Sequence, residues 1–349
     1  MTVKRSKSPS YVKAFLDPDL VREWERFAKD YPYLFWVQAM NIKSTEDWKR
    51  VLKDKRPKLD HQPRLPKDPG EFVALARARR NSYFQLARSF TEPTESLVRD
   101  LLSSTFYLDL EANLGILLED QRVGEGLAIL REFLEVFRGA EPERLLEDLG
   151  SEHLTIFYDA YFPWLSCYES VYRSEKQTMG ELTAMVSRSY REAGFKTLAT
   201  YGRDPSDDLK LELEFIYRLC EAELAAWRVG DKPKAMEYLG LQKEHIHLHL
   251  VEWVPHLCDD LTKPEFKLGV GRKFHRAGEA AERYKGIVEF DFYRAMGNIL
   301  KPLLEHDYAQ VEAMLAAAEH LPLEEVSAGA AGVEPIPTAG ERFYLEKVA

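Results

Sequence analysis

The chain has 349 residues, of which 45% are hydrophobic and 30% are charged, and its formal net charge is −10 at pH 7. This composition is ordinary for a globular protein with a sizeable core, so disorder is not the default expectation. The negative charge disfavours nucleic acid as the main partner and suits a basic one, because a negative field speeds the approach of cationic segments.

Two further features of the sequence bear on where the protein is located and on the role of its cysteines. No run approaches the ~20 apolar residues that cross a bilayer, and the basic start Met1–Lys7 is not followed by the apolar core of a signal peptide. We therefore expect a cytoplasmic protein without membrane insertion. Cys167, Cys220 and Cys258 include no CxxC pair, so we expect core residues rather than a disulfide scaffold, zinc ribbon or iron–sulfur site.

The chain divides into three parts by composition. Residues 1–69 are predicted to form an aromatic-rich N-terminal helical extension that ends in a Pro/Lys-rich linker. Residues 70–319 show helical periodicity, and no alternating run bounded by turn residues indicates a sheet, so the fold class is all-α, a helical bundle. The Gly/Ala/Pro-rich residues 320–349 are expected to be a mobile tail.

Within the bundle, short connections separate the helices, as antiparallel packing requires. The predicted helices run from Phe72 to Phe90, Pro93 to Ser103, Leu108 to Leu118, Gly124 to Phe137, Glu143 to Tyr161, Ser174 to Ala193, Pro205 to Gly230 and Pro233 to Val254. After a polar connection from Asp259 to Gly271, one long helix is predicted to reach Leu304 and another to run from Tyr308 to Glu319.

The first of three short motifs on these helices is Tyr168-Glu169-Ser170-Val171-Tyr172. Tyr168 and Tyr172 lie four residues apart and so share a helix face, where their hydroxyls can build a polar patch on an apolar wall. Glu169 and Arg173 have the same spacing, which a solvated helix surface would also show.

The second motif begins at Asp204, which suits an N-cap with Pro205 at the first helical position. Asp207 and Asp208 follow in the expected first turn, where the helix dipole favours negative charge, so capping alone explains this acidic cluster.

The same helix carries two glutamates that we expect to differ in environment. At ~100° per residue, Glu212 falls inside the apolar sector of the helix whereas Glu214 points away from it. A buried carboxylate is costly without a partner. We therefore expect Glu212 to bond a tyrosine hydroxyl, a helix N-terminus or an arginine, from this chain or from a bound peptide.

The third motif is His249-Leu250-Val251-Glu252-Trp253, in which a tryptophan is more often a core residue than a contact. In order and spacing, the three motifs resemble those of the TorD/DmsD-type, NarJ-related family of molybdoenzyme maturation chaperones. The resemblance covers about Gly70 to Leu315. Cys167 stands where the family usually has a proline, and Asp207-Asp208 stands where it usually has Asp-His.

The resemblance implies a bundle of the TorD-like type, preceded by the N-terminal helical extension, and a function without catalysis or a cofactor. The implied partner is the apo catalytic subunit of a DMSO-reductase-type molybdopterin oxidoreductase, together with its twin-arginine signal peptide. Binding would assist cofactor insertion and delay export. The residues implied for peptide and client binding are Tyr168, Glu169, Tyr172, Asp204, Asp207, Asp208, Glu212, His249 and Trp253.

Two other classes of function stay open. One is a helical adaptor for a partner that is not a molybdoenzyme, with the N-terminal extension as its docking surface. The other is a metal-dependent enzyme that uses the histidines from His245 to His256, because His245 and His249 share a helix face. A zinc hydrolase motif requires a glutamate where Ile246 stands, so we favour a histidine cluster without metal. The client and the oligomeric state are not determined by the sequence.

Overall fold

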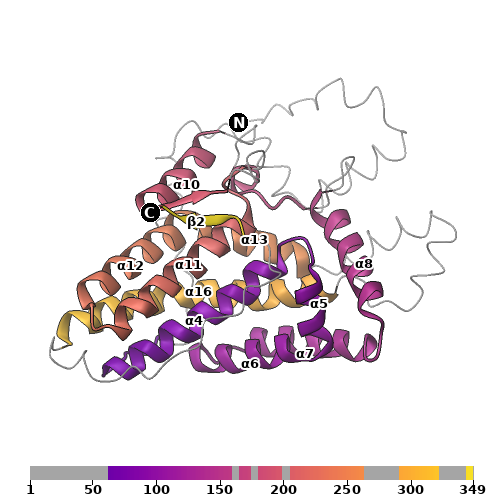
Figure 1. The fold of residues 1–349 in the computed structure, drawn as a ribbon, viewed down its shortest axis with the longest axis horizontal. Coiled ribbons are helices and arrows are strands. Elements are labelled where there is room, and N and C mark those ends of the chain that lie inside the picture. The colour runs from indigo at the N-terminus through magenta and orange to yellow at the C-terminus, as the bar shows by residue number, and fades with distance from the viewer. Residues whose placement is uncertain are drawn as a thin grey trace, which may run out of the picture.

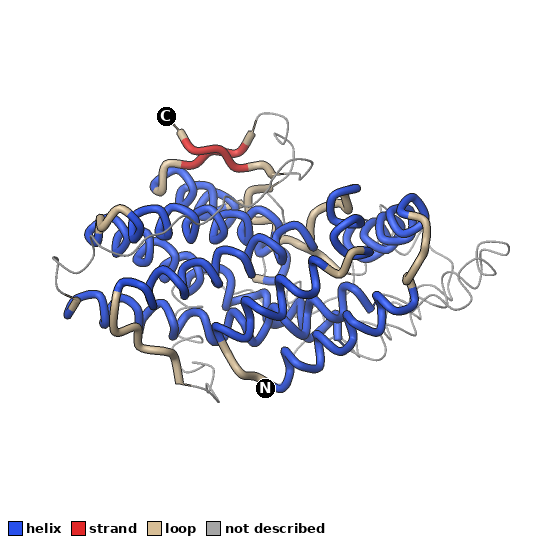
Figure 2. Tube along the Cα trace, turned by 60° about the horizontal axis from the view of Figure 1, so that its bottom comes forward, coloured by secondary structure: helices blue, strands red, loops and turns tan. Residues whose placement is uncertain are grey.

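The structure, a computed structural model, describes residues 62–158, 165–173, 180–198, 205–262, 291–321 and 343–348. These residues form helices and one small antiparallel strand pair, which confirms the predicted all-α bundle (Figures 1 and 2). The helices predicted for the N-terminal extension lie outside the described residues. None of the described helices is both long and apolar enough to span a membrane.

The elements follow one another in chain order. The helices are α4 (Pro69–Ser89), α5 (Glu95–Leu102), α6 (Thr105–Leu117), α7 (Gln121–Val136), α8 (Pro142–His153), α9 (Glu169–Tyr172), α10 (Glu181–Glu192), α11 (Leu209–Arg228), α12 (Lys232–His245), α13 (Val251–Thr262) and α16 (Asp291–His320). Two π-helical turns, η1 (Leu154–Tyr158) and η3 (Ile246–Leu250), continue α8 and α12, and the strands are β1 (Phe195–Thr197) and β2 (Leu345–Lys347).

Several helix starts carry local side-chain caps. The Asp68 carboxylate accepts a hydrogen bond from the Glu71 amide at 3.0 Å, and Pro69 occupies the first turn of α4. Thr94 caps α5 through the Leu97 amide at 3.1 Å. Polar residues at these positions therefore set where the helical periodicity begins.

The centre of the bundle is helix α11, which packs between α4 and α12, while α16 packs against α7, α12 and α13 (Figure 1). Phe72 of α4 and Trp227 of α11 illustrate this core, with ring centroids 4.5 Å apart. Helices α7 and α16 approach closely at Gly126, where an added Cβ would lie 3.0 Å from the backbone oxygen of Ala295 and 2.8 Å from the Ile299 side chain.

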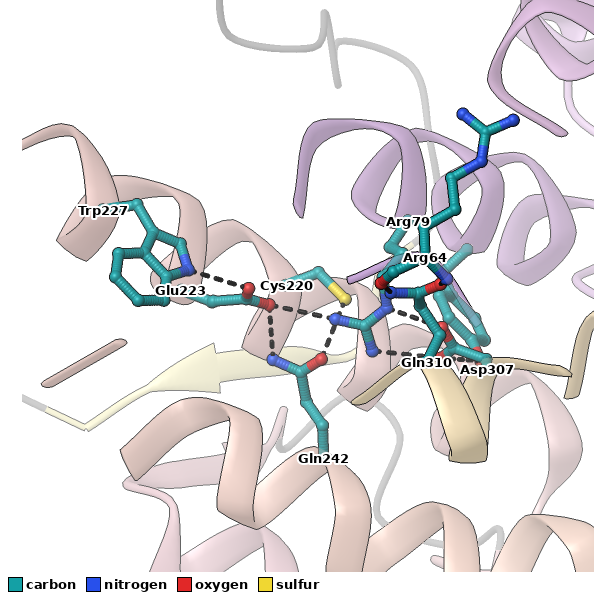
Figure 3. Close-up of polar contacts among 9 residues, drawn as sticks. Arg64, Arg79, Cys220, Glu223, Trp227, Gln242, Asp307 and Gln310 are labelled. Atoms are coloured by element: carbon teal, nitrogen blue, oxygen red, sulfur yellow. Dashed lines mark hydrogen bonds and ion pairs between the residues drawn. The ribbon is translucent and has the colours of Figure 1, made fainter. Parts of the chain in front are cut away.

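A buried arginine links three of these helices (Figure 3). Arg79 of α4 donates from Nε to Asp307 of α16 at 2.6 Å, and from a terminal nitrogen to Glu223 of α11 at 3.0 Å. Burial opposes the charged guanidinium, yet the carboxylates of Asp307 and Glu223 raise the pKa of Arg79 well above its usual value. The guanidinium therefore stays charged inside the core.

Both carboxylates of this network have further donors. Glu223 accepts hydrogen bonds from Trp227 Nε1 and Gln242 Nε2, each at 3.0 Å. The Tyr83 hydroxyl donates to Asp307 at 2.8 Å. Each buried charge is thus compensated by an ion pair and by neutral donors, as a stable buried ionic network requires.

The helix boundaries differ from the predictions most clearly in three places. The helix predicted from Pro205 begins at Leu209, with Asp208 as its N-cap instead of Asp204. Helix α13 continues to Thr262, into the predicted polar connection. The two predicted C-terminal helices form the single helix α16, which contains Pro302. Burial of α16 on several sides outweighs the lost backbone donor at that proline.

The strand pair lies at one side of the bundle (Figure 2) and involves residues of the expected mobile tail. Strands β1 and β2 pair antiparallel, with Lys196 opposite Glu346. The prediction that Glu214 points away from the apolar surface is wrong, because β2 covers that side of α11. The buried Glu214 carboxylate accepts hydrogen bonds from the amides of Tyr344 at 2.8 Å and Leu345 at 3.0 Å.

This contact should make stability depend on pH. Burial raises the pKa of Glu214 from 4.5 to about 7, since the two amides and Arg218 only partly offset it. The folded state therefore holds this proton more tightly than the unfolded chain does. Its contribution is fully present below pH 4.5 and is lost as pH rises through 7, by up to about 3 kcal/mol.

Urea unfolding at pH 4.5 and pH 7.5 measures this effect as the difference between wild type and Glu214→Gln. The variant should lose less stability with rising pH, because the other buried acids titrate alike in both proteins. The matched control is Glu346→Gln on the exposed face of β2, which should keep the wild-type slope. If the free energy of unfolding changed equally with pH in wild type and Glu214→Gln, the raised pKa of Glu214 would be contradicted.

Candidate functional site

The first and second motifs meet through their backbones. Tyr168 pairs with Asp208 in an isolated antiparallel bridge, and the Glu169 amide donates to the Asp207 carbonyl at 2.9 Å. The Leu209 amide in turn donates to the carbonyl of Cys167 at 2.8 Å. The starts of α9 and α11 are therefore held side by side.

The two aspartates at this junction have separate internal roles. Asp207 accepts from the Ser170 amide at 2.9 Å and from the Thr183 hydroxyl at 2.8 Å, which ties α9 to α10. Asp208 caps α11 through the Lys210 amide, and its carboxylate lies 3.1 Å from Lys210 Nζ. Burial raises the pKa of Asp208, against the stabilising charge of Lys210. Capping and helix docking thus account for both residues.

The third motif reaches the first through Glu169. His249 Nδ1 of η3 lies 2.8 Å from one Glu169 oxygen, and Arg173 forms an ion pair with the other. Arg173 also donates to the Leu248 carbonyl at 2.6 Å. All these side chains are buried, so the Glu169–Arg173 pair, whose spacing a solvated surface would also show, is an internal contact.

Glu212 confirms the prediction of a buried carboxyl but not its expected kinds of partner. The neutral imidazole of His245 faces Glu212, with Nε2 3.4 Å from a carboxyl oxygen but without hydrogen-bond geometry. Burial raises the pKa of Glu212 well above its usual value, and the negative charges of Glu169 and Asp207 raise it further. The Trp253 indole N–H also lies near Glu212 and lowers its pKa, although the two groups fall outside strict hydrogen-bond geometry. Burial also lowers the pKa of His245 well below its usual value, and the charge of His249 acts in the same direction.

The aromatic residues line the same region. Trp253 is fully buried and packs on Tyr172 with ring centroids 5.5 Å apart, and its indole N–H lies near Glu212 but outside strict hydrogen-bond geometry. The Tyr172 hydroxyl donates to Asp260 at 3.5 Å. Burial raises the pKa of Glu252, beside Trp253, to about 7. The tryptophan is thus a core residue, as its residue type suggested.

The structure gathers the predicted binding residues at one place, but most of them are inside. Tyr168 is half-buried and lies at the outer end of the junction. Asp204, which was also predicted to bind the peptide, lies outside the described residues. The remaining members are buried and face internal partners, namely Glu169, Tyr172, Asp207, Asp208, Glu212, His249 and Trp253.

Two members of this cluster were missed as partners by the sequence reasoning. Arg173 and His245 each stand four residues from another cluster member, a spacing that the sequence shows. Both residues are buried and contact residues of other motifs because α9, α11 and η3 pack against one another. The hydrophobic periodicity of a single helix does not predict this packing.

Comparison with known proteins gives one family match. Residues 118–259, which contain all three motifs, match the family model described as nitrate reductase delta subunit. No curated protein and no solved structure matches the chain. The matched region includes both the α9–α11 junction and the buried contacts of Glu169, Glu212 and His249. The match over residues 118–259 supports the resemblance to the NarJ-related family of molybdoenzyme maturation chaperones that the three motifs carry.

Proposed function

We propose that this protein binds the apo catalytic subunit of a DMSO-reductase-type molybdopterin oxidoreductase in the cytoplasm, together with the twin-arginine signal peptide of that subunit. It holds the subunit until the cofactor is inserted, and export waits for this step. The observation that carries the proposal is that the family match spans all three motifs, which the fold joins into one cluster.

The candidate residues divide into two roles in this proposal. Tyr168 is the described member that reaches the surface, and it is placed to touch the client. The buried members act as positioning residues, because their bonds hold α9, α11 and η3 in one arrangement. Asp204, which precedes the α11 cap, is proposed to attract the arginines of the peptide through charge-assisted hydrogen bonds.

The experiment is affinity capture of the tagged protein from its native host grown anaerobically, with mass spectrometry of the co-purified proteins. An apo molybdopterin subunit should be recovered with wild type. Tyr168→Ala should reduce its recovery at least about tenfold if the tyrosine is a central contact, because truncating such an aromatic removes most of its binding energy.

The matched control is Tyr107→Ala, which removes another half-buried tyrosine whose hydroxyl bonds only its helix neighbour Glu111. This variant should capture the client as wild type does. Repeated recovery of an unrelated protein, without a molybdopterin subunit, would contradict the proposal and favour the adaptor alternative.

A further inference from the structure

The unpaired polar atoms around Glu212 stand out against the rest of the core. The Arg79 network satisfies each of its buried carboxylates with a cation and neutral donors. In the cluster of the three motifs, by contrast, both ring nitrogens of His245 lack hydrogen bonds, and the donor near Glu212 is the Trp253 indole N–H, which lies outside strict hydrogen-bond geometry. An unsatisfied buried group costs free energy that a bound ligand can recover.

The donor atoms around this gap already lie close together. One atom each from Glu169, Glu212 and His249 can be chosen so that all three lie within 4.8 Å of one another. His245 Nε2 lies 3.4 Å from Glu212. Donors around a tetrahedral ion with bonds of about 2.0–2.1 Å are separated by about 3.4 Å, so a small contraction would complete the site.

The local charge also favours a cation. Glu169 and Asp207 both act electrostatically on Glu212, and Glu169 acts on Glu252. Arg173 is the cation that acts on three of these carboxyl groups, those of Glu169, Glu212 and Glu252. A divalent ion would supply the missing positive charge and would become the largest charge in the cluster.

The backbone that carries the histidine is itself unusual. His249 lies in the π-helical turn η3, directly after α12 ends at His245, and the two imidazole rings are 4.8 Å apart. Such turns inside helices occur frequently at functional sites.

We propose that Glu169, Glu212 and His249 form a binding site for one divalent transition-metal ion of the zinc or iron(II) class. Arg173 orients Glu169 through their ion pair, in the way that outer partners of metal ligands do, and the His245 imidazole lies next to Glu212. The imidazole ligand favours these ions over Mg²⁺. Because the ligands come from α9, α11 and η3, the ion joins all three motifs.

The test uses the full-length protein without a polyhistidine tag, stripped with a chelator and then titrated with Zn²⁺, with Fe²⁺ under anaerobic conditions, and with Mg²⁺. Elemental analysis after dialysis should find one Zn²⁺ or Fe²⁺ per chain. The melting temperature should rise and saturate with either ion and stay unchanged with Mg²⁺. Glu212→Gln should weaken the affinity for the ion at least about tenfold.

The control is His247→Ala, which removes an exposed histidine of the same run and should leave binding unchanged. His249→Ala should abolish binding. If that variant does not fold, Glu212→Gln carries the test, since it keeps the side-chain shape and an oxygen that can face the Trp253 indole N–H. Absence of saturable binding, an unchanged affinity in Glu212→Gln, or loss of binding in His247→Ala would each overturn the proposal.

Discussion

Replacing Arg79 with methionine should lower the free energy of unfolding by about 3–5 kcal/mol. The substitution removes the guanidinium that pairs with Asp307 and Glu223 and leaves two carboxylates buried without a cation. Equilibrium unfolding in urea at pH 7, followed by circular dichroism, measures the loss. The neutral donors Tyr83 and Trp227 remain but do not replace the lost charge.

The matched control is Arg122→Met. Arg122 also pairs with two acids, Asp120 and Glu305, but its side chain is 42% exposed, so the expected loss is about 1 kcal/mol or less. Adding Asp307→Asn and Glu223→Gln to Arg79→Met should restore part of the stability, because the buried charges are then gone. Similar losses for the two single arginine variants would show that burial does not decide the cost.

Two glycines of α7, two residues apart, should respond to alanine with opposite signs. Gly126→Ala should destabilise the protein by about 1–3 kcal/mol, because the new methyl group meets the Ala295 carbonyl of α16 at 3.0 Å and Ile299 at 2.8 Å. Helices α7 and α16 can relieve this overlap only by moving apart, which loosens the packing of both. A valine at position 126 should cost more.

Gly124 provides the control, since it is exposed and an added Cβ would meet no atom within 4 Å. Gly124→Ala should stabilise the protein by about 0.5–1 kcal/mol, because alanine loses less backbone entropy in a helix. Thermal and urea unfolding of both variants at one pH measure the two effects. A stabilising Gly126→Ala would mean that the α7–α16 contact adjusts without strain.

Most helices were predictable because hydrophobic residues that recur with the helical period indicate which side of a helix is buried. Glu212 shows how far this reasoning reaches: its burial and its need for a partner followed from the helix angle alone. Its neighbour His245 could not be predicted, since that contact depends on how α12 docks on α11. Glu214 failed for a related reason, because the strand that buries it comes from a distant part of the chain.

The acidic residues of the second motif show the same limit. Sequence reasoning placed the cap at Asp204, on the basis of Pro205 after it. The structure uses Asp208, because the bridge between Tyr168 and Asp208 holds the backbone of that residue extended, so the helix starts after it. A tertiary contact therefore selected one of several adequate local caps.

The hydrogen bond between Glu214 and the amide of Tyr344 joins residues 130 positions apart in the chain, so it can form only after the ribosome has made the intervening residues. At about 5–20 residues per second, a ribosome needs roughly 7–26 s to make the intervening residues. During that interval β1 has an open edge and the Glu214 carboxylate has no strand amides to bond. Strand β2, which covers the Glu214 side of α11, is thus synthesised last among the described elements. Helix α11 also carries Glu212 and is capped by Asp208.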